Sequence, residues 1–302
     1  MRCANRTNPP TQSHRSAQSP MDVRTGLLPG GYVDAAGEVH RAVQFAPLGG
    51  WDEALLAEAN GQPHPALVTA ILSRCVQRLG NITPVPEQVV RDLLVADRQY
   101  LLLKLREATF GPRLEITIVC PEPECRARID IDFSTEDIPV RESEDKGPVY
   151  QMQLSPEAVS ASAVDQAQRQ VRFRLPNGAD QEVLVPVLAE SEEGAAAALL
   201  RRCIQSVGSG ERLTDRQLDA LSSLARAEIE TQMATVAPHV ELTMEGDCPE
   251  CGRPFTLPFD LVGAVLGELR ISQDLLYREV HYLAFHYHWS EREILDMPRA
   301  RR

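Results

Sequence analysis

The chain has 302 residues and a formal net charge of −12. This acidic balance disfavours non-specific binding to nucleic acids or anionic membranes, and no apolar run reaches the roughly 18 residues of a membrane-spanning helix. Seven cysteines without an apolar secretion signal favour a reducing compartment, where paired cysteines more often bind metal than form disulfides.

The N-terminal half begins with a polar segment and continues with helical patterns. Residues 1–45 are polar and mildly basic and contain Pro and Ser, which predicts a disordered tail. Apolar residues at helical spacing then predict helices over 49–61, 64–82 and 83–111. The last of these starts near Pro86 and ends at Gly111, and a polar break at Asp97 and Arg98 leaves open one helix or two.

Alternating apolar residues then predict two hairpins. The first runs from 114 to 134 around CPEPEC, and the charged loop RESEDKG after it is a candidate boundary. The second covers 170–187, with Pro176, Asn177 and Gly178 as its turn.

The C-terminal half reads mainly as helix. Helices are predicted over 190–208, over 214–236 with Thr214 and Gln217 as a capping box, and over 261–285 as one long helix. A further hairpin at 240–261 carries CPEC, and Ser290 with Glu293 forms a second capping box.

These elements predict an α+β fold. It consists of a helical body, two zinc-ribbon-like β-hairpins joined by a four-cysteine site, and an additional β-hairpin. The predicted divisions are a disordered tail (1–45), a helical segment with the first cysteine hairpin (46–140), an inserted hairpin with helices (141–237), and the second cysteine hairpin with C-terminal helices (238–302).

The cysteines recur in two similar settings. In each, a Glu-apolar-Thr strand start leads to a Cys-Pro-Glu element, so one ribbon is used twice. The ligand candidates are Cys120 and Cys125, spaced C-x4-C, and Cys248 and Cys251, spaced C-x2-C. Four thiolates with no open position are typical of a structural Zn²⁺ site, which the sequence therefore predicts. Unbound thiol pairs or a disulfide are the alternatives.

Other reactive residues favour structural roles. Cys3, Cys75 and Cys203 lack partner spacing and are predicted to be a tail thiol and two buried helix thiols. Nucleotide-binding and nucleophile motifs are missing from the sequence, which predicts that the protein is not an enzyme. The histidines His281, His286 and His288 are interpreted as helix-end packing. Asp130 and Asp132 are interpreted as part of a polar strand face.

Several segments together resemble the baseplate hub assembly proteins of T4-like contractile-tailed phages and their relatives in contractile injection systems. They are ADRQYLLLKLREATFG, CPEPEC, FRLPNGADQE, CPECG and REVHYLAFHYHWSEREILDMPRARR, in that order. The resemblance covers roughly residues 45–302. The long polar N-terminal segment and the C-x4-C spacing of the first cysteine pair depart from the family pattern.

The resemblance implies a non-enzymatic assembly factor or minor structural component of the baseplate hub. Its implied partners are hub, spike or tape-measure proteins, without nucleic acid. Its implied location is the cytoplasm of a bacterial or phage-infected cell, with incorporation into the particle left open. No catalytic residues carry over.

Two hypotheses from other classes compete with this one. A zinc-ribbon nucleic-acid-binding regulator would use Arg126, Arg128 and Arg253 around the cysteines, where acidic residues are interleaved. A metal-dependent enzyme would use the histidine cluster at 281–288 and would need an open metal site.

Overall fold

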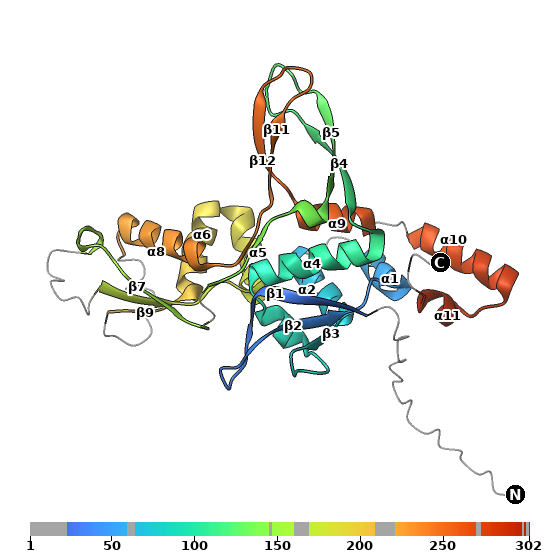
Figure 1. Cartoon of the computed structure of the whole chain (residues 1–302), viewed down its shortest axis with the longest axis horizontal. Coiled ribbons are helices and arrows are strands. Elements are labelled where there is room, and N and C mark those ends of the chain that lie inside the picture. Colours follow the sequence, from blue (N-terminus) through green and yellow to red (C-terminus); the bar gives the residue numbers. More distant parts are fainter. Residues whose placement is uncertain are drawn as a thin grey trace, which may run out of the picture.

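Helices and small antiparallel sheets make up the chain, as Figure 1 shows. This computed structural model describes residues 23–58, 64–144, 147–159, 169–208, 221–269, 273–297, 299 and 302. The strands are β1 (Arg24–Val33), β2 (Val39–Phe45), β3 (Val76–Leu79), β4 (Arg113–Val119), β5 (Arg128–Ser134), β6 (Val140–Arg141), β7 (Tyr150–Gln153), β8 (Gln170–Phe173), β9 (Ile204–Val207), β10 (His239–Val240), β11 (Thr243–Asp247) and β12 (Pro254–Pro258). The α-helices are α1 (Gly50–Glu58), α2 (His64–Cys75), α3 (Glu87–Asp92), α4 (Val95–Phe110), α5 (Gly178–Glu190), α6 (Glu192–Cys203), α8 (Ser223–Val236), α9 (Leu261–Leu269), α10 (Gln273–Tyr287) and α11 (Glu291–Leu295); the short 3-10 helices are η1 (Thr135–Asp137) and η2 (Pro156–Ala158).

The first lobe, defined as residues 24–110, is a three-stranded sheet covered by helices. β2 lies between β1 and β3, and α4 packs along β1. α4 is the core helix because most of its leucines are buried, and it ends where Gly111 adopts a φ of 92° that side chains rarely tolerate. α9, from the other end of the sequence, packs into the same core. The first lobe therefore depends on a C-terminal helix.

The predicted disordered tail is wrong for residues 24–45, which form β1 and β2. The register between these strands shifts between Leu27 and Tyr32, and Gly31 in this bulge has a φ of 93°. A bulge accepts Pro29, which has no N–H for the sheet, so a Pro-Gly-Gly stretch that resembles a loop lies within a strand. The part of the predicted tail at 1–22 lies outside the described residues.

The second lobe, defined as residues 150–236, has its own sheet and core. β8 lies between β7 and β9, and the core contains the fully buried side chains of Phe173, Cys203 and Ile229. The predicted hairpin at 170–187 is wrong in its second half, where α5 begins. Asn177 caps α5, since its side chain accepts the N–H of Asp180 while the Asp180 carboxylate accepts the N–H of Asn177. This reciprocal capping favours a helix over the expected turn.

Three other helix predictions have definite outcomes. The break in the 83–111 pattern falls at Leu93 and Leu94, where α3 ends and α4 begins, rather than at Asp97 and Arg98. The long helix predicted at 261–285 is wrong in its continuity, because α9 and α10 are separate helices. The capping box of Ser290 with Glu293 is confirmed at the start of α11. The Thr214 capping box lies outside the described residues, and α8 is capped by Ser222. The remaining domain divisions stay predictions.

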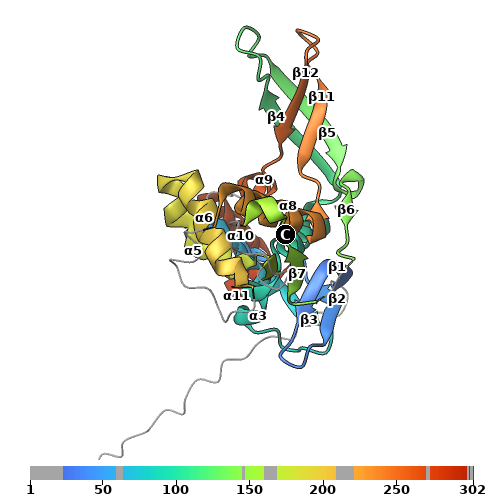
Figure 2. The same cartoon turned by 90° about the vertical axis from the view of Figure 1, so that its left-hand side faces the viewer.

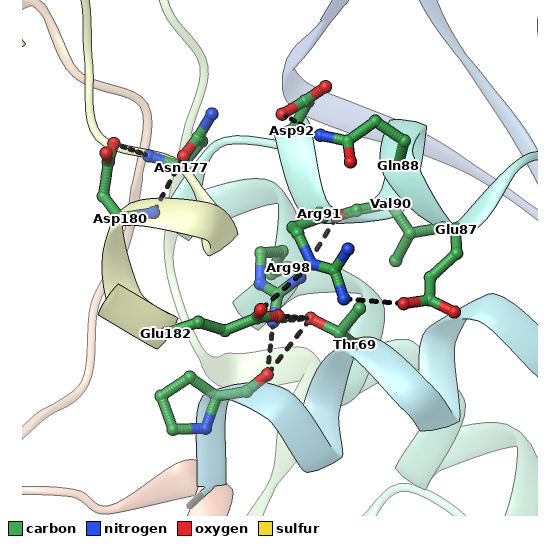
Figure 3. Close-up of polar contacts among 11 residues, drawn as sticks. Thr69, Glu87, Gln88, Val90, Arg91, Asp92, Arg98, Asn177, Asp180 and Glu182 are labelled. Atoms are coloured by element: carbon green, nitrogen blue, oxygen red, sulfur yellow. Dashed lines mark hydrogen bonds and ion pairs between the residues drawn. The ribbon is translucent and has the colours of Figure 1, made fainter. Parts of the chain in front are cut away.

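Arg98 is almost fully buried where α4 of the first lobe meets α5 of the second lobe (Figure 3). Its Nη1 donates to the carbonyl oxygen of Val90 at 3.1 Å. Its Nη2 donates to the carbonyl oxygen of Pro65 at 2.8 Å and to the Thr69 hydroxyl at 2.9 Å. The Thr69 hydroxyl donates in turn to Glu182 of α5 at 2.5 Å. Burial lowers the pKa of Arg98 to about 10, so its guanidinium stays charged at neutral pH. Its hydrogen bonds stay within the first lobe, and Thr69 continues the network to Glu182 of the second lobe.

The neighbouring Asp97 fixes the bulge of β1 onto α4. Its carboxylate accepts the N–H of Gly30 at 2.8 Å and the N–H of Gly31 at 2.9 Å, and the side chain is fully buried. Burial raises the pKa of Asp97 from 3.8 to about 6, although both N–H groups and the positive charge of Arg41 oppose the shift.

This raised pKa predicts a pH dependence of stability. Between pH 3.8 and about 6 the folded state binds more protons at Asp97 than the unfolded state does. The stability due to this carboxyl is therefore greatest below pH 3.8 and falls as the pH rises toward 6. We expect the unfolding free energy of the wild type, relative to Asp97→Asn, to drop by about 2 kcal/mol between pH 4 and pH 7 in urea titrations. A difference that does not change with pH would contradict this assignment.

Two long hairpins project together from the body as an arm, seen in both Figure 1 and Figure 2. β4 pairs with β5 and β11 pairs with β12, each antiparallel. At the base of the arm β6 pairs with β10, and the rings of Phe133 and Phe259 meet edge to face with centroids 5.6 Å apart. Among the described helices, none is long and apolar enough to cross a membrane.

Candidate metal centre

The tip of the first hairpin is a tight turn that carries Cys120 and Cys125. The N–H of Cys120 donates to the carbonyl oxygen of Ala127 at 2.8 Å, which closes the turn. The N–H groups of Cys125 and Arg126 both donate to the carbonyl oxygen of Glu122, at 3.0 and 3.2 Å. Arg126 adopts a φ of 52°, so the chain reverses directly after the second cysteine.

The tip of the second hairpin uses the same bonding pattern with two fewer residues. The N–H of Cys248 donates to the carbonyl oxygen of Arg253 at 3.0 Å. The N–H of Gly252 donates to the carbonyl oxygen of Cys248 at 2.8 Å. Gly252, directly after Cys251, has a φ of 67°. Glycine adopts this backbone conformation at little cost, which explains the Cys-Gly pair at this turn.

The structure brings all four sequence-predicted cysteines together. Their Sγ atoms all lie within 4.8 Å of one another. Two sulfur pairs join one hairpin to the other: Cys120 to Cys251 at 3.9 Å, and Cys125 to Cys248 at 3.8 Å. The two tips therefore meet through their thiols.

These distances fit one metal ion held by four sulfur atoms. A tetrahedral ion with metal–sulfur bonds of about 2.3 Å has sulfur atoms about 3.8 Å apart along each edge. A disulfide would require about 2.05 Å between two of them. Since the cross-hairpin pairs lie 3.8 and 3.9 Å apart and all four cysteines are free, the arrangement suits a shared ion rather than bonded sulfur pairs.

The surroundings favour different protonation states among the thiols. The backbone N–H of Cys251 lowers the pKa of Cys248 to about 7. Burial raises the pKa of Cys120 to about 12. A dication binds thiolates, so binding at this cluster releases the protons of these thiols and weakens as the pH falls.

The arm around the cluster is supported by packing and by an ion pair. A small apolar cluster, separate from the two lobe cores, contains Cys120 and Cys248 together with Ile129 and Phe255. Arg253 Nη1 of one tip lies 2.5 Å from the carboxylate of Glu122 on the other tip. The two hairpins therefore contact each other beyond the four thiols.

The other candidate residues are not gathered into this centre. The side chains of His281, His286 and His288 are exposed on or after α10, and they belong to neither of the metal-ligand clusters found among the described residues. Asp130 accepts a hydrogen bond from Thr117 at 2.7 Å, and Asp132 pairs with Arg113, which agrees with a polar outer strand face.

A second cluster lies in the segment that the sequence predicts to be a tail, where polar composition hides it. Asp34, Glu38 and His40 bring their ligand atoms within 4.8 Å of one another at the turn between β1 and β2. The Asp34 carboxylate already accepts the N–H groups of Ala36 and Glu38, each at 2.9 Å, and lies 3.1 Å from His40 Nε2. These bonds account for the cluster as an Asx-type turn.

Comparison with known proteins gives one match. The family model described as T4 bacteriophage base plate protein matches residues 38–262, well over half of the chain. The chain matches no curated protein and no solved structure. The matched range contains both cysteine hairpins and ends at the start of α9.

Proposed function

This chain belongs to the T4 bacteriophage base plate protein family, and we propose that it is a non-enzymatic assembly factor or minor structural component of the baseplate hub. The setting would be a phage tail or a contractile injection system. The family match carries the baseplate assignment, which is a structural or assembly role. The restriction to the hub rests on the resemblance of the segments between residues 96 and 302 to hub assembly proteins.

We propose that the arm holds one structural Zn²⁺ through Cys120, Cys125, Cys248 and Cys251. The sulfur spacing of 3.8 to 3.9 Å between hairpins supports this assignment. Four thiolates fill a tetrahedral ion and leave no position for water or substrate, which favours a structural role over a catalytic one. Zinc bound here would tie together hairpins that are more than a hundred residues apart in sequence.

The proposed partners are hub, spike or tape-measure proteins. Membership of the family implies contact with other baseplate proteins. The net charge of −12 suits contact with basic protein surfaces better than contact with nucleic acid. At the metal centre, Arg253 is paired with Glu122, which reduces the positive charge that a nucleic-acid-binding ribbon would need.

Co-expression tests this proposal. The full chain carrying an affinity tag is expected to recover hub, spike or tape-measure proteins of the same tail cluster in a pull-down. Cys248→Ser, which removes one metal ligand, is expected to recover less of them, and Arg253→Ala at the same tip is the matched control. Failure to recover any tail protein, together with normal particles from a strain lacking the gene, would contradict the assembly role.

A further inference from the structure

Identical residues recur at selected positions of the two lobes with a constant spacing, so that position n of the first lobe corresponds to position n + 128 of the second. Identical pairs at that spacing include Phe45 and Phe173, Gly50 and Gly178, Asp52 and Asp180, Arg74 and Arg202, and Cys75 and Cys203. Secondary structure follows the same spacing. Both ends correspond for two pairs, α2 with α6 and β3 with β9, and the first residues correspond for two more, α1 with α5 and α4 with α8. Cys120 and Cys248 also correspond.

Hydrogen bonds recur at corresponding atoms with nearly equal lengths. Two pairs are between backbone atoms: Ala46 N to Cys75 O (3.0 Å) matches Arg174 N to Cys203 O (2.9 Å), and Gly80 N to Ala42 O (2.7 Å) matches Gly208 N to Gln170 O (2.7 Å). Two pairs use an aspartate: Arg74 Nε to Asp52 Oδ1 (2.5 Å) matches Arg202 Nε to Asp180 Oδ1 (2.6 Å), and Gly49 N to Asp52 Oδ2 (2.8 Å) matches Asn177 N to Asp180 Oδ2 (3.0 Å).

The strand pairing repeats in the same way, including its irregularity. Val43 pairs with Leu79 as Val171 pairs with Val207. The register shifts directly before Phe45 in one sheet and directly before Phe173 in the other. A shared bulge and shared side-chain bonds are specific features that two unrelated sheets have no physical reason to share.

We infer that the chain is a tandem duplication of one unit, and that the start of α1 and the start of α5 are one docking site used twice. Repeat 1 comprises residues 24–134 and repeat 2 comprises residues 150–258, each ending in a cysteine hairpin. The proposed metal centre is then an interface site, to which each repeat contributes two thiols.

On repeat 2, the docking site holds an arginine of repeat 1. A Cβ built on Gly178 would lie 2.7 Å from Nε of Arg98, so only glycine leaves room for the guanidinium against the start of α5. The backbone also joins there, since the N–H of Gly178 donates to the carbonyl oxygen of Leu93 at 3.1 Å. Glu182, one turn further along α5, pairs with Arg91 Nε at 2.9 Å. A glycine and a glutamate four residues later thus accept arginines from the docked unit. At the corresponding site of repeat 1 the glutamate is Glu53, which is offset by one position from the n + 128 equivalent of Glu182.

On repeat 1, the corresponding site holds the C-terminal segment, defined as residues 291–297, 299 and 302. A Cβ built on Gly50 would overlap the guanidinium of Arg302 and would lie 2.7 Å from Cδ2 of Leu295. Arg302 Nη2 lies 2.6 Å from the Glu53 carboxylate, and both side chains are almost completely buried. The C-terminal segment therefore occupies on repeat 1 the place that repeat 1 occupies on repeat 2.

This arrangement assigns the C-terminal segment a capping role. Units that dock head to tail leave one docking surface uncovered at the end of the array. Stacked repeat proteins close such a surface with a terminal capping element. Here Trp51 of α1 donates to Asp296 at 2.9 Å and the apolar side chains of α11 cover the same helix, which completes the cap.

Hydrogen exchange on the full chain tests the shared docking site. Gly50→Ala is expected to raise amide exchange in α11 by roughly tenfold, because the added methyl group displaces Arg302. Arg302→Ala is expected to do the same, and the double variant is expected to add little because both changes remove one contact. Gly178→Ala is expected to raise exchange at the α3–α4 junction and the first turn of α5, and to leave α11 unchanged.

The control is Gly267→Ala in α9, where a Cβ would meet no atom within 4 Å. It is expected to change exchange in neither region. Unchanged exchange in α11 for both Gly50→Ala and Arg302→Ala would overturn the capping role. Equal acceleration of α11 by Gly178→Ala would overturn the equivalence of the two sites.

Discussion

Replacing Cys248 by serine is expected to abolish binding of the proposed Zn²⁺ by the full chain and to destabilise it by several kcal/mol, as loss of a structural zinc ligand generally does. Cys248 is almost fully buried between the two hairpin tips, and its Sγ lies 3.8 Å from that of Cys125. Without the fourth thiolate, the proposed ion would lack one of its four ligands and would no longer hold the two tips together. Inductively coupled plasma mass spectrometry measures the metal content, and the unfolding midpoint in urea measures the loss of stability.

Two controls separate metal loss from general damage. Cys203→Ala removes a buried thiol of the second-lobe core, outside the cluster, and is expected to keep the metal while losing some stability. Arg253→Ala removes the exposed ion pair at the same tip and is expected to keep both the metal and the melting temperature. A Cys248→Ser protein with unchanged metal content and midpoint would contradict the assignment of this thiol.

Replacing Arg98 by alanine is expected to cost about 3–5 kcal/mol of unfolding free energy, because the change breaks a buried charged network. The carbonyl oxygens of Val90 and Pro65 and the hydroxyl of Thr69 would each lose the hydrogen bond that the buried Arg98 donates. Glu182 would lose the buried positive charge beside it. Chemical denaturation followed by tryptophan fluorescence and by circular dichroism measures the loss.

Arg172→Ala is the matched control for this prediction, because Arg172 is exposed on β8. It is expected to change the unfolding free energy by less than about 0.5 kcal/mol. A loss of similar size for Arg98→Ala and Arg172→Ala would contradict the view that the buried network of Arg98 links the two lobes.

The sequence predicts the clustering of the four cysteines better than it predicts the lobes. Paired cysteines in matching strand–turn–strand settings are a local signal, and the hairpins that carry Cys120 and Cys248 lie where alternation placed them. The pairing of thiols across the hairpins depends on how two distant segments meet in the fold. The sequence alone therefore could not predict that Cys120 lies beside Cys251 and Cys125 beside Cys248.

Two predictions are wrong where tertiary contacts determine local structure. The Pro-Gly-Gly stretch of β1 resembles a loop until Asp97, far along the chain, accepts the N–H groups of Gly30 and Gly31. The Asn-Gly pair before α5 resembles a hairpin turn until Asp180 closes the capping box and binds Arg174 and Arg202. In both places a buried carboxylate decides the backbone conformation.

The duplication leaves a weak trace in the sequence outside the cysteine ribbons. VQF before the first helix pair and CVQRLG after it recur as VRF and CIQSVG, 128 positions later. The intervening helices have diverged so far that helical spacing of apolar residues is their main common feature. The fixed spacing therefore shows which positions of the two sheets correspond, although the short matching segments are too few to predict either sheet by themselves.

The most direct measurement of the central claim is X-ray absorption at the zinc edge, with metal quantification, on the protein as isolated from cells. Binding by Cys120, Cys125, Cys248 and Cys251 predicts one zinc per chain, surrounded by four sulfur atoms at about 2.3 Å. A protein without stoichiometric zinc, or a zinc ion with nitrogen or oxygen in place of any sulfur, would contradict a site shared by the two hairpins.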